Sequence, residues 1–290
     1  MGPLLPPDIL AQAADAVRNG ANAIVFANDD LAFEMFVRHG KQPEDITDFV
    51  PIGCYEPAIM GKELCCSMSA LCNMVKPFEE LMATTPAPQG MDEVLQGYQA
   101  ILGRHLRQAM NETRAWELEW PQVNPSPVLS STMDSCFAKG RDVSAAGTEY
   151  GTSGIMCAGI GTVADSLAAI EYLVFDQKLC SWDELRRALQ DNWQGHDELR
   201  LTALRRAPKW GCNDERADRF AVAVSRFAAD LINNTPNSRG GHFQMGCWSI
   251  DHAVYMGEHC AATRDGRRNG EPISKNAGAT AWIARVSPDC

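Results

Sequence analysis

Apolar side chains recur every three to four positions in several stretches of this chain, a spacing typical of helices with one buried face. A long helix of this kind is predicted from Met91 to about Trp116. Residues 181–184, Ser-Trp-Asp-Glu, have the form of a capping box and predict a helix over 182–193. The clearest stripe lies in residues 214–233 and consists of Ala217, Phe220, Ala221, Val224, Phe227, Ala228 and Leu231.

Shorter apolar runs predict strands that lead directly into helices. Residues 23–27 form one such run, and Asn28 follows as the expected N-cap of a helix over 31–38. Residues 64–73 form another apolar run, and residues 242–250 predict a further strand. Because strands and helices alternate in this way, the sequence predicts an α/β fold with parallel strands.

Residues 147–161 carry five glycines and are interpreted as a strand followed by a loop. Asp165 and Ser166 come next and are expected to cap a helix that ends near Phe175. A Pro-rich break at 121–127 is the best internal seam, although it is not interpreted as a domain boundary.

Residues 50–57, Val-Pro-Ile-Gly-Cys-Tyr-Glu-Pro, break both kinds of periodicity. Pro restricts the backbone and Gly permits unusual angles, so this stretch predicts a rigid turn or fingertip. In an extended tip, side chains two positions apart point to the same side. Cys54 and Glu56 would therefore face one pocket, where a thiol and a carboxylate can act on the same substrate.

The chain of 290 residues is long enough for one large or two small domains, and 45% hydrophobic and 22% charged residues are ordinary for a soluble globular protein. The net charge of −11 argues against nucleic acid or an anionic membrane as the main partner. The 11 cysteines are odd in number and lack the spacing of a disulfide framework. No signal-peptide pattern or membrane-length apolar run is present, so a reducing cytoplasm is the expected location.

A metal site is not expected from the cysteines and histidines near the end of the chain. Cys247, His252, His259 and Cys260 lie close together, but their spacing fits no Cys-x2-Cys or His-x3-His zinc pattern. A thiol hydrolase that pairs Cys54 with a histidine remains an alternative, although no histidine lies near Cys54 in the sequence.

Residues 53–57, Gly-Cys-Tyr-Glu-Pro, resemble the finger loop of glycyl radical enzymes, the pyruvate formate-lyase family. Further segments resemble this family in the same order along nearly the whole chain. They are residues 20–29, ending in Phe-Ala-Asn-Asp, then Pro-Val-Leu-Ser-Ser at 127–131, Asp-Ser-Leu-Ala-Ala-Ile at 165–170 and Asp-Gly-Arg at 265–267.

The resemblance implies a ten-stranded α/β barrel built of two antiparallel half-barrels and wrapped by helices, with the finger loop inside. This chain would supply the second half of that barrel. Residues 1–262 would form the partial barrel domain with its finger loop at 50–57, and residues 263–290 would begin a truncated glycyl radical domain.

The resemblance also implies the chemistry. Cys54 would become a thiyl radical that abstracts hydrogen from a small substrate, and Glu56 would act as the base. A glutamate at this place is typical of dehydratases and C–X lyases in the family, whereas pyruvate formate-lyase itself has two adjacent fingertip cysteines. Formate C-acetyltransferase, the activity of pyruvate formate-lyase itself, is the nearest alternative, and the glutamate counts against it. Ser67 is a weak candidate for substrate binding, and Met68 beside it departs from the diol dehydratases.

The family's radical glycine, in an Arg-Val-x-Gly-aromatic motif, has no counterpart here. Arg285-Val-Ser-Pro has proline where glycine is needed, so no radical glycine is assigned. The chain alone is therefore expected to be inactive, as a fragment of an anaerobic enzyme or as a non-catalytic partner subunit. No directly bound cofactor is expected. The full-length enzyme would carry the glycyl radical, depend on a radical S-adenosylmethionine activating enzyme and form a homo-oligomer.

Overall fold

The computed structural model describes residues 6–21, 28–53, 56–247 and 252–275. The chain separates into two compact units, Met1–Glu63 and Leu64–Cys290. The domain division predicted at residue 263 rests on the family resemblance and stays a prediction.

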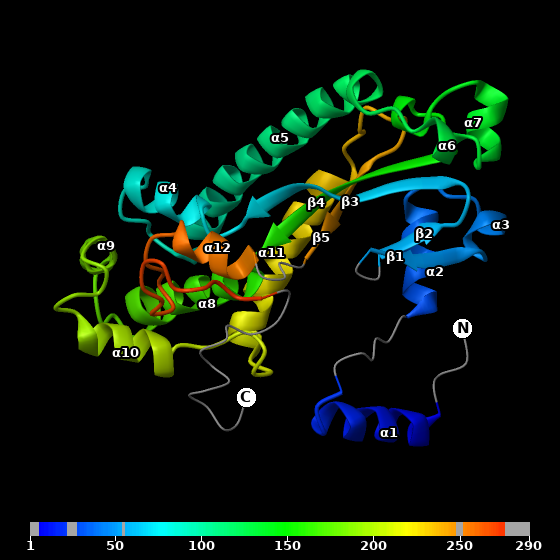
Figure 1. Cartoon of the computed structure of the whole chain (residues 1–290). Helices are drawn as coiled ribbons and strands as arrows, with labels where there is room; N and C mark the ends of the chain where they lie inside the picture. The colour runs from blue at the N-terminus through cyan, green and yellow to red at the C-terminus, as the bar shows by residue number, and fades with distance from the viewer. Residues whose placement is uncertain (1–5, 22–27, 54–55, 248–251, 276–290) are drawn as a thin grey trace. The chain divides into compact units, whose positions relative to one another are not determined.

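The first unit contains three helices and a hairpin among its described residues (Figure 1). The helices are α1 (Pro7–Arg18), α2 (Asp29–Arg38) and α3 (Pro43–Ile46), and the strands are β1 (Phe49–Ile52) and β2 (Glu56–Ile59). The strands pair antiparallel, with Phe49 opposite Ile59 and Ile52 opposite Glu56.

The start of α2 follows the sequence prediction, because the side chain of Asn28 accepts a hydrogen bond from the Leu31 backbone N–H. Phe36 on this helix is buried, and its ring centroid lies 5.7 Å from that of Phe49 on β1. This aromatic contact packs α2 against the hairpin. The predicted strand at residues 23–27 lies outside the described residues.

The second unit combines helices with a sheet of β3 (Glu63–Asn73), β4 (Tyr150–Ala158) and β5 (Phe243–Gly246), in that order among the described residues. β4 and β5 run parallel, with Ser153 opposite Phe243. The helices are α4 (Pro77–Thr84), α5 (Met91–Val123), α6 (Pro127–Ser130), α7 (Asp134–Lys139), α8 (Ile160–Ile170), α9 (Trp182–Gln190), α10 (Asp197–Arg205), α11 (Glu215–Asn233) and α12 (His252–Glu258), with a 3-10 turn η1 (Val143–Ala145) and a π-helical turn η2 (Glu171–Asp176). The described part of the chain therefore has an α/β fold.

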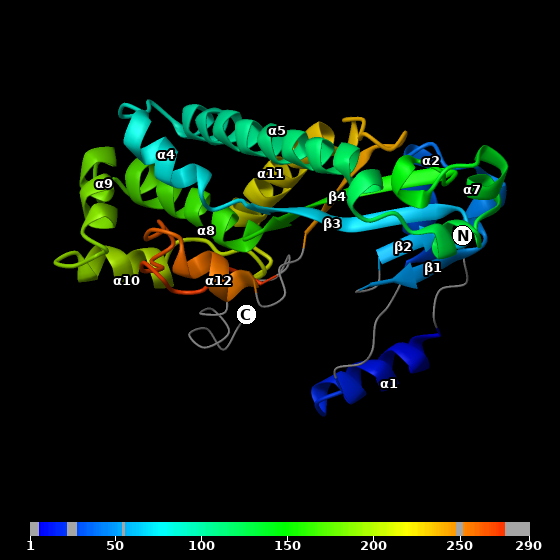
Figure 2. The same cartoon turned by 45° about the horizontal axis from the view of Figure 1, so that its top comes forward.

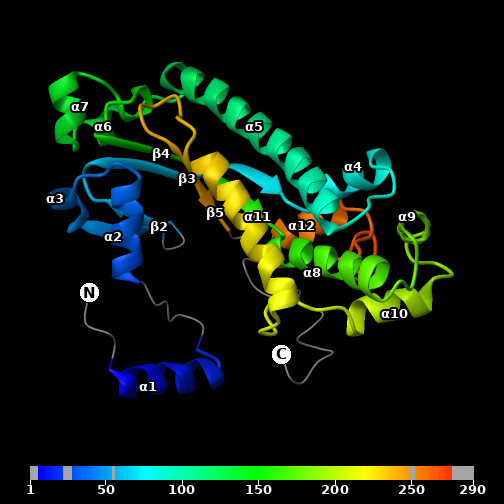
Figure 3. The ribbon, with the colours of Figure 1, turned by 180° about the vertical axis from the view of Figure 1, so that it is seen from behind.

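The core of the second unit lies where α11 packs against α8, β5 and α5. Seen from behind, α11 crosses in front of the sheet (Figure 3), and α5 runs beside α4 (Figure 2). The stripe predicted for 214–233 supplies this contact, since Phe220, Val224 and Ala228 are buried. Tyr98 on α5 joins the core and donates its hydroxyl hydrogen to the Met74 carbonyl at 2.6 Å. The long helix predicted from Met91 continues past Trp116 to Val123, with Pro121 inside it.

The predicted capping box at Ser181 and Glu184 is confirmed, with both of its reciprocal hydrogen bonds present. The cap predicted at Asp165 is wrong. Helix α8 already begins at Ile160, after Gly159 in the left-handed region at φ 89°. Asp165 therefore lies inside the helix, fully buried, and its carboxylate accepts a hydrogen bond from the Trp210 backbone N–H at 2.7 Å. The family segment at 165–170 is thus part of the core.

The Asp-Gly-Arg segment at 265–267 lies in a turn organised by Arg267, which is buried. Nη1 donates to the carbonyls of Arg268 and Glu271, each at 2.7 Å, and Nη2 donates to the carbonyls of Cys260 and Ala261 at 3.2 and 2.6 Å. One guanidinium thus ties together both sides of the turn. Across the described ranges, no helix is both long and apolar enough to cross a membrane.

Candidate functional site

The fingertip predicted at residues 50–57 is a hairpin, formed by β1 and β2. Gly53 leaves β1 with φ 52°, in the left-handed region that glycine adopts without strain. The prediction of a turn from Gly53 and the flanking prolines is therefore confirmed. Cys54 and Tyr55 lie outside the described residues, so the predicted pairing of Cys54 with Glu56 stays a prediction.

Glu56 is the first residue of β2, on the far side of the turn from Gly53, and it is half-buried. Its carboxylate folds back toward the start of the turn. A Cβ added to Gly53 would stand 2.8 Å from Glu56 Oε2. The backbone of Gly53 therefore leaves the space that the carboxylate occupies, two positions along the chain from Cys54. A group held there can act as a base close to the fingertip.

Two contacts at the open end of the hairpin hold it closed. The Met60 backbone N–H donates to the Asp48 carbonyl at 3.2 Å, just outside the last strand pair. Lys62, in the turn after β2, contacts the Asp45 carboxylate on α3. The hairpin is therefore anchored to the helix that precedes it.

Ser67, the third predicted site residue, lies in the middle of β3 and is half-buried. The strand beside it approaches very closely: a Cβ on Gly154 would stand 1.8 Å from the Ser67 carbonyl oxygen. Gly154 thus permits the contact between β3 and β4 at Ser67. A role for Ser67 in substrate binding stays a prediction.

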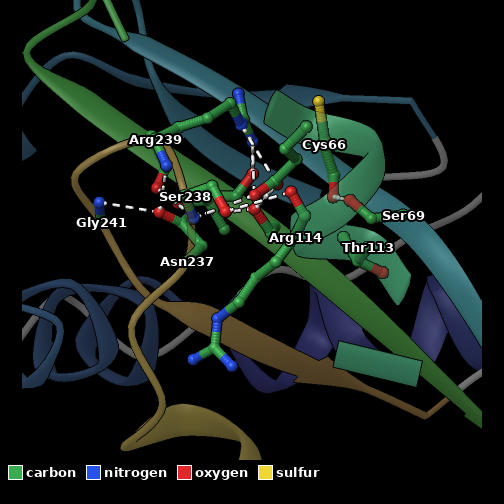
Figure 4. Close-up of polar contacts among 12 residues, drawn as sticks. Cys66, Ser69, Thr113, Arg114, Asn237, Ser238, Arg239 and Gly241 are labelled. Carbon is green, nitrogen blue, oxygen red and sulfur yellow. Dashed lines mark hydrogen bonds and ion pairs between the residues drawn. The ribbon is translucent and has the colours of Figure 1, made fainter. Parts of the chain in front are cut away.

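A buried polar network that the sequence did not predict lies beside Cys66 on β3 (Figure 4). Glu117 of α5 and Arg239 form an ion pair at 3.2 Å, with side chains 1% and 2% exposed. Glu117 also accepts hydrogen bonds from Ser153 of β4 and from the Ser238 backbone N–H. Arg239 Nη2 donates to the Thr152 carbonyl at 2.5 Å. The network therefore joins α5, β4 and the loop before β5.

Cys66 faces this network from β3. Burial raises the pKa of its thiol, the Arg239 guanidinium lowers it, and the Glu117 carboxylate raises it again, with a net increase. Because neighbouring residues on a strand point to opposite faces, Ser67 points away from the network. No sequence signal identified the network, since Glu117 and Arg239 are 122 positions apart.

A separate groove of about 500 Å³ runs beside β3, α4 and α5 in the second unit. Within its lining Lys76 pairs with Glu79 at 3.0 Å, and Glu80 pairs with Arg104 from outside the lining. Ser67, the predicted site residue of this unit, is not among the residues that line this groove. The described residues also contain no group of three or more His, Cys, Asp or Glu side chains that could hold a metal ion.

Comparison with known proteins gives matches over almost the entire chain. A family model described as pyruvate formate lyase-like matches residues 3–257. The chain is 28% identical to the (2S)-3-sulfopropanediol dehydratase of Klebsiella oxytoca over 290 residues, which cover 94% of this chain and 35% of that protein. It is 26% identical to the isethionate sulfite-lyase of Desulfovibrio desulfuricans, again covering 95% of this chain and 35% of that protein.

A solved structure gives the same result. The crystal structure of a glycyl radical enzyme from Archaeoglobus fulgidus superposes with a TM-score of 0.86 at 28% identity, covering 93% of this chain and 36% of that chain. The chain thus spans about a third of the length of the relatives it matches.

Proposed function

Since this chain belongs to the pyruvate formate lyase-like family, we propose that it supplies the finger loop of a glycyl radical enzyme of the dehydratase or C–X lyase type. The observation that carries the proposal is the fingertip hairpin, in which Glu56 folds back over Gly53, the residue that precedes Cys54 in the sequence. The relatives named above, a dehydratase and a sulfite-lyase, support this class of reaction.

In the proposed reaction, the Cys54 thiyl radical removes a hydrogen atom from a substrate carbon that bears a hydroxyl group. The thiol S–H bond forms and the unpaired electron passes to that carbon. Glu56 takes the proton of the hydroxyl, which makes the radical a strong electron donor. The bond to the neighbouring leaving group then breaks, and the leaving group departs with the electron pair. The product radical takes a hydrogen atom back from Cys54, so the thiyl is restored.

The unpaired electron would come from a glycyl radical that we place on no residue of this chain. A radical S-adenosylmethionine activating enzyme would generate it in the full-length protein, a homo-oligomer in the cytoplasm. We further propose that β3, β4 and β5 belong to the second half of a ten-stranded α/β barrel and that Ser67 faces its substrate. These assignments follow the family, and the chain's share of its relatives' length is consistent with a partial chain.

The closest alternative is formate C-acetyltransferase activity. Two observations count against this alternative. The fingertip residue two positions after Cys54 is a glutamate, and the adjacent cysteines Cys65 and Cys66 lie on β3, outside the hairpin. A second alternative is a non-catalytic subunit that pairs with a partner supplying the rest of the barrel.

The test is an anaerobic assay of the natural gene product that contains this chain, co-expressed with its activating enzyme, on vicinal diols and hydroxysulfonates. We expect Cys54→Ser to abolish turnover while the organic radical signal in electron paramagnetic resonance persists. Glu56→Gln should lower kcat by about a hundredfold or more, within the range of general-base catalysis. Cys180→Ser, which changes a half-buried cysteine of the second unit, is the control.

Turnover retained by Cys54→Ser contradicts the proposal. Transfer of acetyl label from pyruvate to the protein supports the acetyltransferase alternative instead. Lack of any activity, together with co-purification of a second chain that restores it, supports the partner-subunit alternative.

A further inference from the structure

A fully buried ion pair lies at the base of the fingertip hairpin. Lys41 Nζ is 2.5 Å from Glu63 Oε1 and 2.6 Å from Oε2, and the two side chains are 3% and 0% exposed. Lysine and glutamate are rarely buried to this degree unless they are paired. Both residues belong to the first unit. Lys41 follows the end of α2, and Glu63 is the first residue of β3, after the turn that ends β2.

The Lys41 ammonium is held in place by the end of α2. The Lys41 backbone N–H donates to the Phe36 carbonyl at 3.0 Å, which wraps the chain back over the last helical turn. Gly40 permits this reversal with φ 75°. Nζ then stands 4.3 Å from the centroid of the Phe36 ring, within the range of a cation–π contact. The position of the positive charge is therefore set by the helix.

Glu63 transmits this position to the hairpin. Its Oε2 accepts a hydrogen bond from the Ile59 backbone N–H at 2.9 Å. Ile59 is the last residue of β2 and pairs with Phe49, the first residue of β1. The carboxylate thus connects α2 with the last paired residues of the hairpin, while β2 leads from there to Glu56 over a span of roughly 10 Å.

We propose that Lys41 and Glu63 are positioning residues that fix the orientation of the fingertip hairpin and, through β2, the position of the Glu56 carboxylate. This inference rests on the proposed function, because the fingertip is the part that acts. Apolar residues of similar volume commonly replace a buried ion pair without loss of stability. They could not, however, accept the Ile59 N–H, and that acceptor ties the hairpin to α2.

The test compares amide hydrogen exchange, read by mass spectrometry, in the intact folded protein and three variants. Lys41→Met leaves the buried carboxylate of Glu63 without the lysine ammonium. It should raise amide exchange in peptides covering β1 and β2 at least tenfold relative to peptides covering α2. Lys41→Met/Glu63→Met restores apolar packing but not the acceptor. It should unfold within a few degrees of the wild type and still show the raised exchange in the hairpin. Arg38→Met removes an exposed arginine that pairs with Glu34 on α2 itself, and it should change exchange in the hairpin less than twofold.

Two results would overturn the inference. One is wild-type exchange of the hairpin in the double variant, and the other is an equal rise in exchange across α2 and the hairpin, since either describes a pair that only stabilises the fold. The active enzyme supplies a separate readout, in which the double variant should lower kcat about tenfold with KM within twofold. Exchange needs no radical, so a Cys54→Ser enzyme that retains turnover would refute the proposed function and leave the exchange result intact.

Discussion

Glu56 Oε2 lies 2.8 Å from the point at which a Cβ on Gly53 would stand, so the carboxylate of Glu56 occupies the space that a side chain at Gly53 would need. Gly53 therefore serves the fingertip in two ways. Its φ of 52° turns the chain, and its missing side chain admits the carboxylate.

Gly53→Ala should displace the Glu56 carboxylate at a small cost in stability, because the end of a glutamate side chain can swing aside. The left-handed backbone costs about 1 kcal/mol in the free energy of unfolding. Turnover should fall by tenfold or more, measured alongside chemical denaturation. Gly61→Ala is the matched control, since Gly61 also has a positive φ, 70°, but nothing within 4 Å of the added Cβ. Equal turnover in the two variants would contradict this prediction.

Glu117→Ala should destabilise the second unit by about 3–5 kcal/mol, because it leaves the buried guanidinium of Arg239 without its carboxylate. Urea denaturation measures this loss. Glu80→Ala is the control, since Glu80 pairs with Arg104 at the surface and should contribute within about 1 kcal/mol. A comparable loss in both variants would show that burial of the Glu117 pair has no special effect.

Gly154→Ala should prevent normal packing of β3 against β4. The added Cβ would stand 1.8 Å from the Ser67 carbonyl oxygen, and backbone atoms cannot move aside as a side chain can. We expect a loss of about 3 kcal/mol or more in the free energy of unfolding. Gly97→Ala on α5 is the control, because its nearest neighbour is the flexible end of Leu81. Its change should stay within about 1 kcal/mol, helped by the helix propensity of alanine.

Acid should lower the free energy of unfolding, partly through protonation of Asp142. Burial raises the pKa of this carboxyl, but hydrogen bonds from the hydroxyls of Ser144 and Ser130 and from the backbone N–H groups of Ser144 and Ser126 outweigh it and hold the pKa at about 2. The folded protein therefore binds fewer protons than the unfolded chain in acid. The resulting stabilisation is complete above about pH 5 and is lost as pH falls through 2.

Asp142→Asn removes this contribution. The difference in the free energy of unfolding between wild type and Asp142→Asn should be about 1 kcal/mol larger at pH 6 than at pH 2.5, after allowance for solvent screening of a partly exposed group. Thermal denaturation across that range measures it. A difference that does not vary with pH would show that Asp142 is not the group responsible.

The parts of the fold that the sequence predicted depend on contacts between near neighbours. The capping box at Ser181 uses residues three positions apart, and the turn at Gly53 needs only its own backbone freedom. The stripe around Phe220 and Val224 repeats at helical spacing. Each of these signals lies within a few residues, so the α/β class, the long helices and the fingertip could be predicted.

The parts that were missed depend on distant partners or on competing local signals. Glu117 lies in a helix whose polar residues resemble a solvent-facing surface, and its partner Arg239 comes from a loop. Lys41 and Glu63 are 22 positions apart in the sequence. Asp165 has the composition of a helix cap, but Gly159 begins the helix earlier and leaves the carboxylate buried in its middle. The catalytic role of Cys54 rests on family resemblance, because no local pattern distinguishes it from the other cysteines.

The Arg267 turn has a consequence for the way relatives of this chain are found. Four of its guanidinium hydrogen bonds go to carbonyl oxygens of its own loop, so the Asp265-Gly266-Arg267 sequence serves to hold the backbone together. A protein that had lost its radical chemistry would still need this sequence in order to fold. Genome searches that use the turn as a signature will therefore count folded members of the family, whereas under the proposed function Cys54 and Glu56 are the positions by which to select those that can react.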